Sequence, residues 1–244
     1  MISIPTLALI GADSPSWVLP KLESLGFSVC ILPHDDRLPR PVRSHPDMLI
    51  FNLGNKIFCS RKYYESNSDV FSLISSYGYE IEPSDATISN RYPDDIAFNF
   101  IYVNNRICGN IQHIAKEIIE YTKTINCSTV SVKQGYAKCS TVVLGNKAII
   151  TADSGIYNAA VDLGVEALKT ENSPSISLPG YNYGFIGGAC GVFKNTVYFI
   201  GNIDIHPFAD IIKVFCKKHG YQVLSLSTMP LTDIGGVTFL PLLG

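Results

Sequence analysis

The residues of this 244-residue sequence that could do chemistry gather in three stretches rich in glycine and tyrosine, 134–139 (QGYAKC), 181–188 (YNYGFIGG) and 233–236 (DIGG). Cys139 could act as a nucleophile, because nearby positive charge or hydrogen-bond donors make a cysteine thiolate reactive. The tyrosine rings suit stacking on a planar cation. The Asp233 carboxylate suits pairing with such a cation through two parallel hydrogen bonds. We expect ligand-binding roles for Gln134, Tyr136, Asp153, Tyr183 and Asp233, and catalytic roles for Cys139 as nucleophile and His206 as base.

The two catalytic candidates also have structural interpretations. Cys139 could simply pack at the centre of the fold, and Cys190, in a glycine-rich strand, fits a place where backbones approach closely. His206 precedes an expected helix, whose N-terminus disfavours an imidazolium and so favours a neutral ring that can accept a proton. The same position also suits a side chain that caps the helix.

Other polar residues favour structural roles. Asp153, Asn202 and Asn110 recur at one position of a repeated unit, which indicates helix capping first and ligand contact second. Asp233 differs, because no helix follows it. A proline- and arginine-rich stretch at 33–47 predicts a solvated loop, and we expect the remaining histidines to lie at the surface: His34, His45, His113 and His219.

Composition excludes several classes of function. The sequence has 19 lysines and arginines against 21 aspartates and glutamates. It therefore lacks the excess of positive charge that would attract nucleic acid or an anionic membrane. The seven cysteines show no CxxC and no paired Cys/His spacing, which is typical of buried thiols in a reducing compartment. Because HExxH, GxGxxG and Walker sequences are also missing, we expect no metal, nucleotide or flavin cofactor.

The N-terminus carries no targeting signal that we recognise. No basic residue precedes the first apolar run, and Asp13 interrupts that run too early for a signal peptide or a membrane span. We therefore expect a cytoplasmic protein whose partner is a small-molecule ligand. A homodimer is left open by the sequence.

The elements that must position these residues recur as one unit of strand, hairpin turn, strand, helix and strand. The segment AIITADS at 148–154 is similar to ALIGADS at 8–14, which indicates an internal repeat. Glycine and asparagine predict hairpin turns at 54–55, 104–105, 145–146 and 194–195. Helices are expected at about 66–77, 111–124, 155–163 and 207–218, with one more after Asp13-Ser14-Pro15.

The two ends of the sequence complement each other. The residues that close the second strands follow at near-equal steps: Asp13, Arg61, Asn110, Asp153 and Asn202. The first unit lacks its first strand, and the segment 234–243 is a first strand with no helix behind it. Pairing them closes a ring of five units and removes two open sheet edges. A doubly wound sheet is disfavoured, because hairpin turns join strand to strand. We expect one α/β domain over 1–244.

With five ββαβ units and a last strand that closes on the first, the chain resembles the pentein fold of the guanidino-group-modifying enzymes. These include arginine deiminase, dimethylargininase, agmatine deiminase and the amidinotransferases. The motifs QGYAKC, LPGYNYGFIGG and LTDIGG are most similar to an uncharacterised bacterial family of that fold. The resemblance implies a pentein-type five-bladed α/β propeller. The fold also includes a translation initiation factor that catalyses nothing, so it confers no activity by itself.

The resemblance fails at the positions that carry the enzymes' chemistry. Where their nucleophile follows Gly-Gly and two further residues, this chain has Phe239, and where they have His-x-Asp it has Phe185-Ile-Gly-Gly. By spacing, Gly135 to Cys139 corresponds to Gly235 to Phe239. We therefore expect Cys139 to face the same central cleft from a neighbouring unit.

Two classes of function remain open. The chain could bind, or act as a relative of the enzymes that act on, a small guanidino or amidino compound in the axial cleft. Alternatively, it is a catalytically inert pentein that acts as a protein-binding module. An alkylation-sensitive Cys139 that small ligands protect would favour the first class. A large exposed apolar or charged face outside the cleft would favour the second.

Overall fold

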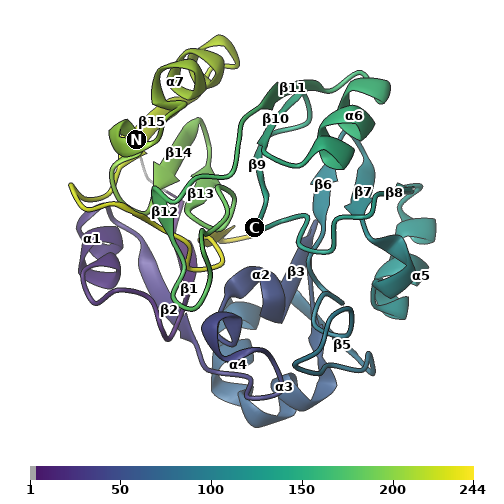
Figure 1. The fold of residues 1–244 in the computed structure, drawn as a ribbon. Coiled ribbons are helices and arrows are strands. Elements are labelled where there is room, and N and C mark those ends of the chain that lie inside the picture. Colours follow the sequence, from purple (N-terminus) through teal and green to yellow (C-terminus); the bar gives the residue numbers. More distant parts are fainter. Residues whose placement is uncertain (1–3) are drawn as a thin grey trace.

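A computed structural model describes residues 4–244 and shows five three-stranded sheets arranged around a central axis (Figure 1). In each sheet the first strand pairs antiparallel with the second, and the second pairs parallel with the third. The sheets are β17 (Thr238–Pro241), β1 (Thr6–Gly11) and β2 (Ser28–Leu32); β3 (Ile50–Leu53), β4 (Lys56–Ser60) and β5 (Glu80–Ser84); β6 (Ile101–Val103), β7 (Arg106–Gly109) and β8 (Ser128–Ser131); β9 (Thr141–Leu144), β10 (Ala148–Thr151) and β11 (Glu166–Lys169); and β13 (Cys190–Phe193), β14 (Thr196–Phe199) and β15 (Gln222–Ser225).

Helices connect the second and third strands and lie around the outside of the ring (Figure 1). They are α1 (Val18–Ser24), α3 (Arg61–Ser66) with α4 (Ser68–Ser76), α5 (Lys116–Thr124), α6 (Ser154–Asp162) and α7 (Ala209–Lys218). The first strands are innermost. β9 contacts both β6 and β13, and β13 in turn contacts β17. The loops that lead into the first strands are therefore brought to the axis.

The ring closes as expected. β1 pairs antiparallel with β17, in a register that runs from Thr6 opposite Pro241 to Leu9 opposite Thr238. Leu9 and Leu240 are fully buried in one apolar cluster with Ile57 of the next sheet, so closure also joins neighbouring units. The predicted propeller of ββαβ units is confirmed.

Local sequence accounts for the hairpins. Asn104 and Asn105 have φ angles of 50° and 57°, the left-handed pair that a type I′ turn requires and that asparagine tolerates. Gly54, Gly145 and Lys194 also have positive φ at the other predicted turns. These turns match the twist of the flanking strands, so short local signals determine the strand pairing within each unit.

Several predicted boundaries were wrong. The strands are shorter than expected, because residues 96–100, 138–140, 184–189 and 234–237 form loops that converge on the axis. Asp13-Ser14-Pro15 forms a turn, and α1 begins only at Val18, after Trp17. The helix expected at 66–77 is α4, but a further helix, α3, precedes it. The helix expected at 111–124 begins as a separate 3₁₀ turn, η2 (Ile111–His113).

Two features were missed. The stretch 33–47 is not a wholly solvated loop, because it contains η1 (Arg40–Val42) and leads into a buried helical turn, α2 (Pro46–Leu49). A small parallel sheet also joins β12 (Ile176–Ser177) to β16 (Leu231–Thr232) beside the axis. It ties the stretch before β13 to the stretch before β17.

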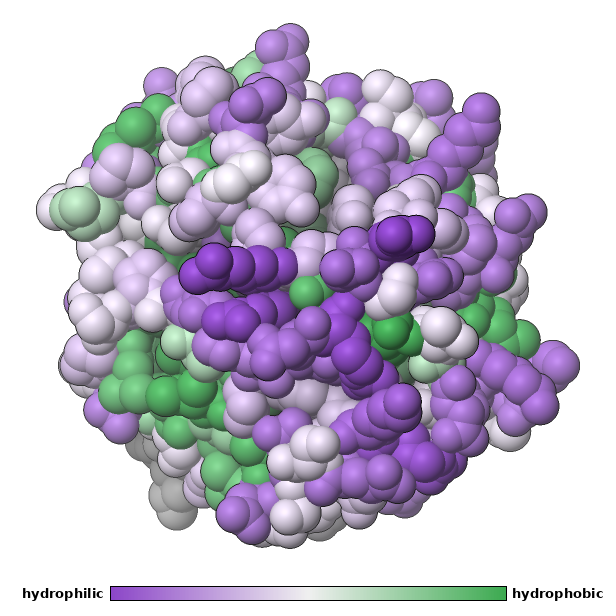
Figure 2. All heavy atoms as spheres, turned by 60° about the horizontal axis from the view of Figure 1, so that its bottom comes forward, coloured by the Kyte–Doolittle hydropathy of each residue, from purple (hydrophilic) through white to green (hydrophobic). Residues whose placement is uncertain are grey.

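The seven cysteines are all buried and free, as expected for small apolar side chains. Among the helices of residues 4–244, none is long and apolar enough to cross a membrane. Figure 2 brings the side with α3 and α4 forward, and hydrophilic side chains cover most of that face.

Candidate functional site

The three stretches singled out in the sequence meet at the axis around one cavity of about 260 Å³, the axial cavity. The loops before β3, β9, β13 and β17 supply its walls, so only the closed ring assembles it. The lining residues are Val42, His45, Met48, Tyr136, Cys139, Leu178, Tyr181, Asn182, Tyr183, Phe185 and Asp233.

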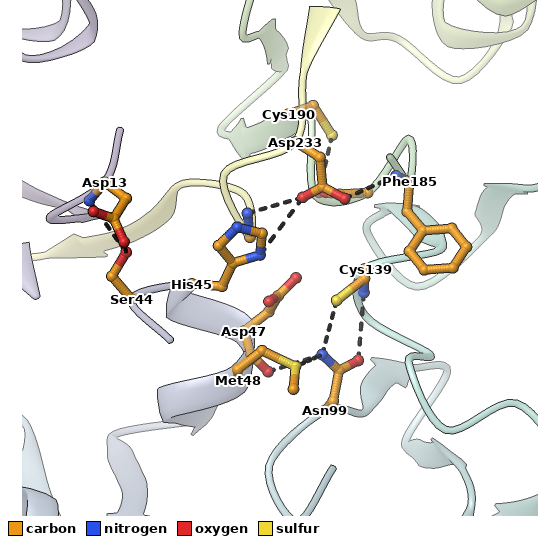
Figure 3. A network of polar contacts seen from close by, with 12 residues as sticks. Asp13, Ser44, His45, Asp47, Met48, Asn99, Cys139, Phe185, Cys190 and Asp233 are labelled. Atoms are coloured by element: carbon orange, nitrogen blue, oxygen red, sulfur yellow. Dashed lines mark hydrogen bonds and ion pairs between the residues drawn. The ribbon is translucent and has the colours of Figure 1, made fainter. Parts of the chain in front are cut away.

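Asp233 is a buried carboxylate held by backbone donors. Its Oδ2 accepts a hydrogen bond from the N–H of Phe185 at 2.8 Å, and its Oδ1 accepts one from the N–H of Gly235 at 3.0 Å (Figure 3). A side chain at Gly184 or Gly188 would collide with this carboxyl group, so the glycines are needed for its approach. Burial raises the pKa of Asp233, while His45 and the two N–H groups oppose the rise.

His45 faces Asp233 from α2. Proline at the first position of this short helix suits a helix start, and His45 in front of it is extended. The side chain is buried, and its Nδ1 lies 3.7 Å from Oδ1 of Asp233. Burial lowers the pKa of His45 more than Asp233 and Asp13 raise it. A neutral imidazole therefore lines the axial cavity at pH 7.

Cys139 lies at the inner end of the cavity beside an amide. Nδ2 of Asn99 donates a hydrogen bond to the Cys139 sulfur at 2.9 Å, and the main-chain N–H of Lys138 donates to Oδ1 of Asn99 at 2.8 Å. Burial raises the pKa of Cys139 well above its usual range, and the carboxylates of Asp47 and Asp233 add to the rise. Without a ligand, Cys139 is therefore a neutral thiol and a poor nucleophile.

Asp47 is a second buried acid near this thiol. Burial raises the pKa of Asp47 to about 7, and the charge of Asp233 adds to the rise. Within residues 4–244 neither carboxylate oxygen accepts a hydrogen bond of good geometry, but the Cys139 thiol is close enough to lower the pKa of Asp47. An unpartnered buried carboxylate is costly, so Asp47 is in place to take up a proton or to accept a bond from a bound molecule.

Aromatic rings form another part of the cavity wall. The hydroxyl of Tyr136 donates a hydrogen bond to Oδ2 of Asp95 at 2.7 Å, which holds the ring. The Tyr136 and Phe185 ring centroids lie 6.4 Å apart, and those of Tyr183 and Phe185 lie 6.0 Å apart. Tyr181 and Tyr183 are exposed at the mouth. A flat ligand could therefore enter between ring faces and carboxylates.

Four of the predicted site residues line the axial cavity, namely Tyr136, Cys139, Tyr183 and Asp233. Gln134 and Asp153 do not line it. Nε2 of Gln134 donates to Oδ2 of Asp153 at 3.1 Å, and Oδ1 of Asp153 caps α6 by accepting from the N–H of Ile156 at 2.8 Å. The structure therefore gives this pair a capping role beside a separate surface hollow.

His206 is also absent from the cavity lining. Its Nδ1 accepts a hydrogen bond from the N–H of Phe208 at 3.1 Å, just before α7, which fits the capping interpretation. Cys190 lies elsewhere as well, with its thiol directed at the carbonyl of Gly187. His45, expected at the surface, is buried and lines the axial cavity together with Cys139, whereas His206 does not.

The proposed correspondence between Cys139 and Phe239 was wrong. Phe239 lies within β17 opposite Ala8, and its ring packs against Phe27 between sheets. Cys139 lies before β9 begins. Cys139 faces the axis because it belongs to the loop that leads into a first strand, and not because it matches a strand position.

Sequence reasoning missed His45, Asp47 and Asn99, although two signals were present. The pair His45-Pro-Asp47 lies directly before a first strand, as Asp233 does. Asn99 interrupts the apolar run IAFNFIYV, and a polar residue inside such a run needs a buried partner. For metals, residues 4–244 contain no group of three histidine, cysteine, aspartate or glutamate side chains that could hold an ion.

Comparisons with known proteins agree with the architecture. The model of a "family of unknown function (DUF6873)" matches residues 9–238. A mutant of dimethylarginine dimethylaminohydrolase from Pseudomonas aeruginosa, solved with citrulline, is 11% identical with a TM-score of 0.59, over 98% of this chain and 100% of that one.

Two further structures are similar. ArgZ, an arginine dihydrolase of the cyanobacterial ornithine-ammonia cycle, is 12% identical with a TM-score of 0.56, over 98% of this chain and 40% of that one. SxtG, an amidinotransferase of Microseira wollei, is 12% identical with a TM-score of 0.54, over 91% and 77%. No curated protein sequence matches. At these identities the likeness shows the pentein fold and nothing about the ligand.

Proposed function

This chain belongs to the DUF6873 family and has the pentein fold, and we propose that its axial cavity binds a small compound that carries a guanidinium or amidinium group. The observation that supports this most is the pair of buried acids. Asp233 lines the cavity, Asp47 lies behind it, and the facing imidazole of His45 is neutral. A planar cation would supply the positive charge that these carboxyl groups lack.

The shape and chemistry of the walls also suit such a ligand. Phe185 and Tyr136 line the same cavity as Asp233, whose oxygens are already oriented by two main-chain donors. A guanidinium that donates to Asp233 would lie flat against the rings. Lining residues at the mouth, Tyr181 and Asn182, leave room for a substituent that extends outward.

The same cation would change the state of Cys139. The neighbouring negative charges help to keep its pKa high, and a positive charge in the cavity would offset them and lower it. His45 could then accept the thiol proton, because its ring is neutral. Any nucleophilic step at Cys139 would thus depend on the ligand being bound.

The test is a thermal-shift screen of wild type, Asp233→Asn and the surface control Asp69→Asn. The cations are arginine, agmatine, methylated arginines, creatine and guanidine, with urea and citrulline as neutral controls. A ligand at 100 times its Kd stabilises the fold by about 2.7 kcal/mol, which for this length shifts Tm by roughly 5–10 °C. Stabilisation of wild type and Asp69→Asn, lost in Asp233→Asn, is the expected result.

Two outcomes would count against the proposal. If no cation stabilises wild type beyond the neutral controls, the ligand class is wrong. If Asp233→Asn responds as strongly as wild type, the cation binds elsewhere.

A further inference from the structure

A second cavity, of about 490 Å³, lies among the first strands at the other end of the axis. All five first strands contribute to its walls, which reach the hairpin turn at Gly145 and Asn146. The axial cavity is built instead from the loops before those strands, and no residue lines both cavities. We call the second one the turn-side cavity.

Lys138 brings a positive charge to this cavity. Of the lining residues within 4–244, Lys138 alone is positively charged. A side-chain carbon at Gly236 would lie 4.0 Å from its Nζ and 2.8 Å from the carbonyl oxygen of Cys190. Cys190 lines the turn-side cavity and not the axial one, and the charge of Lys138 opposes the rise that burial causes in the pKa of its thiol. The ammonium group therefore lies on the turn side of the axis.

This ammonium group has no partner in the described chain. Within residues 4–244, Nζ of Lys138 forms no ion pair and no hydrogen bond, yet it is not one of the polar atoms that the fold encloses. The charge is therefore open to the space that Lys138 lines.

The acid in the same lining does not neutralise Lys138 from within the cavity. Both carboxylate oxygens of Asp47 are enclosed, and they interact with Cys139 and Asp233, which line the axial cavity. Since Asp47 is the one acid among the lining residues of 4–244, no carboxylate of the described chain faces the ammonium group across the turn-side cavity.

The remaining walls are largely apolar. Half-buried side chains line the cavity from three first strands, namely Val143 of β9, Val192 of β13 and Phe239 of β17. Pockets of several hundred Å³ with apolar walls and a few polar groups are typical of small-molecule sites. A ligand here would have its charged end at Lys138 and an apolar body along the strands.

We propose that the turn-side cavity binds a monocarboxylate with an apolar body, of the arylalkanoate or branched alkanoate class. Its carboxylate would accept hydrogen bonds from Nζ of Lys138, and its body would lie against Val143, Val192 and Phe239. One ammonium group balances one negative charge, and apolar walls make a second charge costly to bury, which disfavours phosphates and dicarboxylates. Because no residue lines both cavities, this proposal does not rest on the cation site.

Calorimetric titration tests the proposal with four probes: 3-phenylpropanoate, 4-methylpentanoate, 3-phenylpropanamide and acetate. The amide keeps the apolar body and lacks the charge, and acetate keeps the charge and lacks the body. At least one of the two larger acids should bind saturably, and the amide and acetate should each bind at least about tenfold more weakly. No cation is present, so the outcome is separate from that of the guanidinium screen.

The variant is Lys138→Met, which keeps most of the side-chain length, with Lys133→Met as the exposed control in the same stretch. Lys138→Met should weaken binding of the acid at least about tenfold, and Lys133→Met should not. Since Lys138→Met could fold poorly, wild-type methyl NMR gives a second readout, in which the acid should shift the methyls of Val143 and Val192 more than those of Leu178, which lines the axial cavity. Absence of saturable binding, equal binding of the amide, unchanged binding in folded Lys138→Met, or larger shifts at Leu178 would each overturn the proposal.

Discussion

Asn99 and Cys139, which belong to adjacent units of the ring, are joined by a 2.9 Å hydrogen bond from the amide to the sulfur. The same Nδ2 also donates to the carbonyl of Asp47 at 3.0 Å, and Oδ1 accepts from the N–H of Lys138. One fully buried amide therefore connects three of the loops that meet at the axis.

Asn99→Ala should destabilise the protein by about 2–4 kcal/mol, because it leaves a buried N–H and a buried carbonyl without partners and opens a small void. Urea unfolding measures the change. The matched control is Asn158→Ala on the exposed face of α6, which should stay within about 0.5 kcal/mol of wild type. Equal effects of the two substitutions would show that the amide does not hold the loops.

Asp47→Asn should change the pH dependence of stability. Asp47 has a pKa of about 7 in the folded protein against an ordinary value of 3.8, so the folded form holds its proton more tightly. The stabilisation of the folded protein by this proton is complete below pH 4. It is lost as the pH rises through 7, which lowers the free energy of unfolding by up to about 4 kcal/mol. Asn cannot ionise, so its advantage over wild type should be larger at pH 8 than at pH 5.

The measurement is the unfolding free energy of both proteins across this range, with Asp69→Asn as the exposed control. A difference between Asp47→Asn and wild type that does not vary with pH would mean that Asp47 titrates normally.

Gly188→Ala should abolish cation binding without removing any polar group. A methyl group there would collide with Oδ1 of Asp233 and displace the carboxylate from its main-chain donors. In the thermal-shift screen, Gly188→Ala should lose ligand stabilisation as Asp233→Asn does. The double variant should lose no more than either single one, because both act on one group. Additive losses would place the two residues in separate sites.

Leu240→Ala should show that ring closure stabilises the whole fold. Leu240 is fully buried in β17 against residues of β1 and the neighbouring sheet, so its truncation should cost about 2–5 kcal/mol in denaturant unfolding. Leu242, two residues on and 41% exposed, is the control, and Leu242→Ala should change stability by less than about 0.5 kcal/mol. Deleting 235–244 should then unfold the chain, since it exposes two sheet edges.

The sequence by itself determined the repeating unit and the closure of the ring. Turns such as Asn104-Asn105 are encoded in two adjacent residues, and an N-terminal unit without a first strand leaves one place for the C-terminal strand. Three of the four stretches that line the axial cavity were also predictable, because glycines and tyrosines mark them. These patterns involve residues that are close in sequence, so they can be recognised without knowledge of the tertiary structure.

Only the tertiary structure decided which polar side chains share the site. His45 lies in a proline-rich stretch that looks solvated, and its burial depends on α2 turning inward beneath Gly235, whose carbonyl accepts the N–H of Asp47 at 3.4 Å. His206 and Asp153 have motif contexts that fit chemistry, but each accepts a hydrogen bond from a main-chain N–H at the start of the helix that follows it. A sequence shows which residues are neighbours along the chain, whereas the burial and charge that set a pKa come from residues brought together across the axis of the ring.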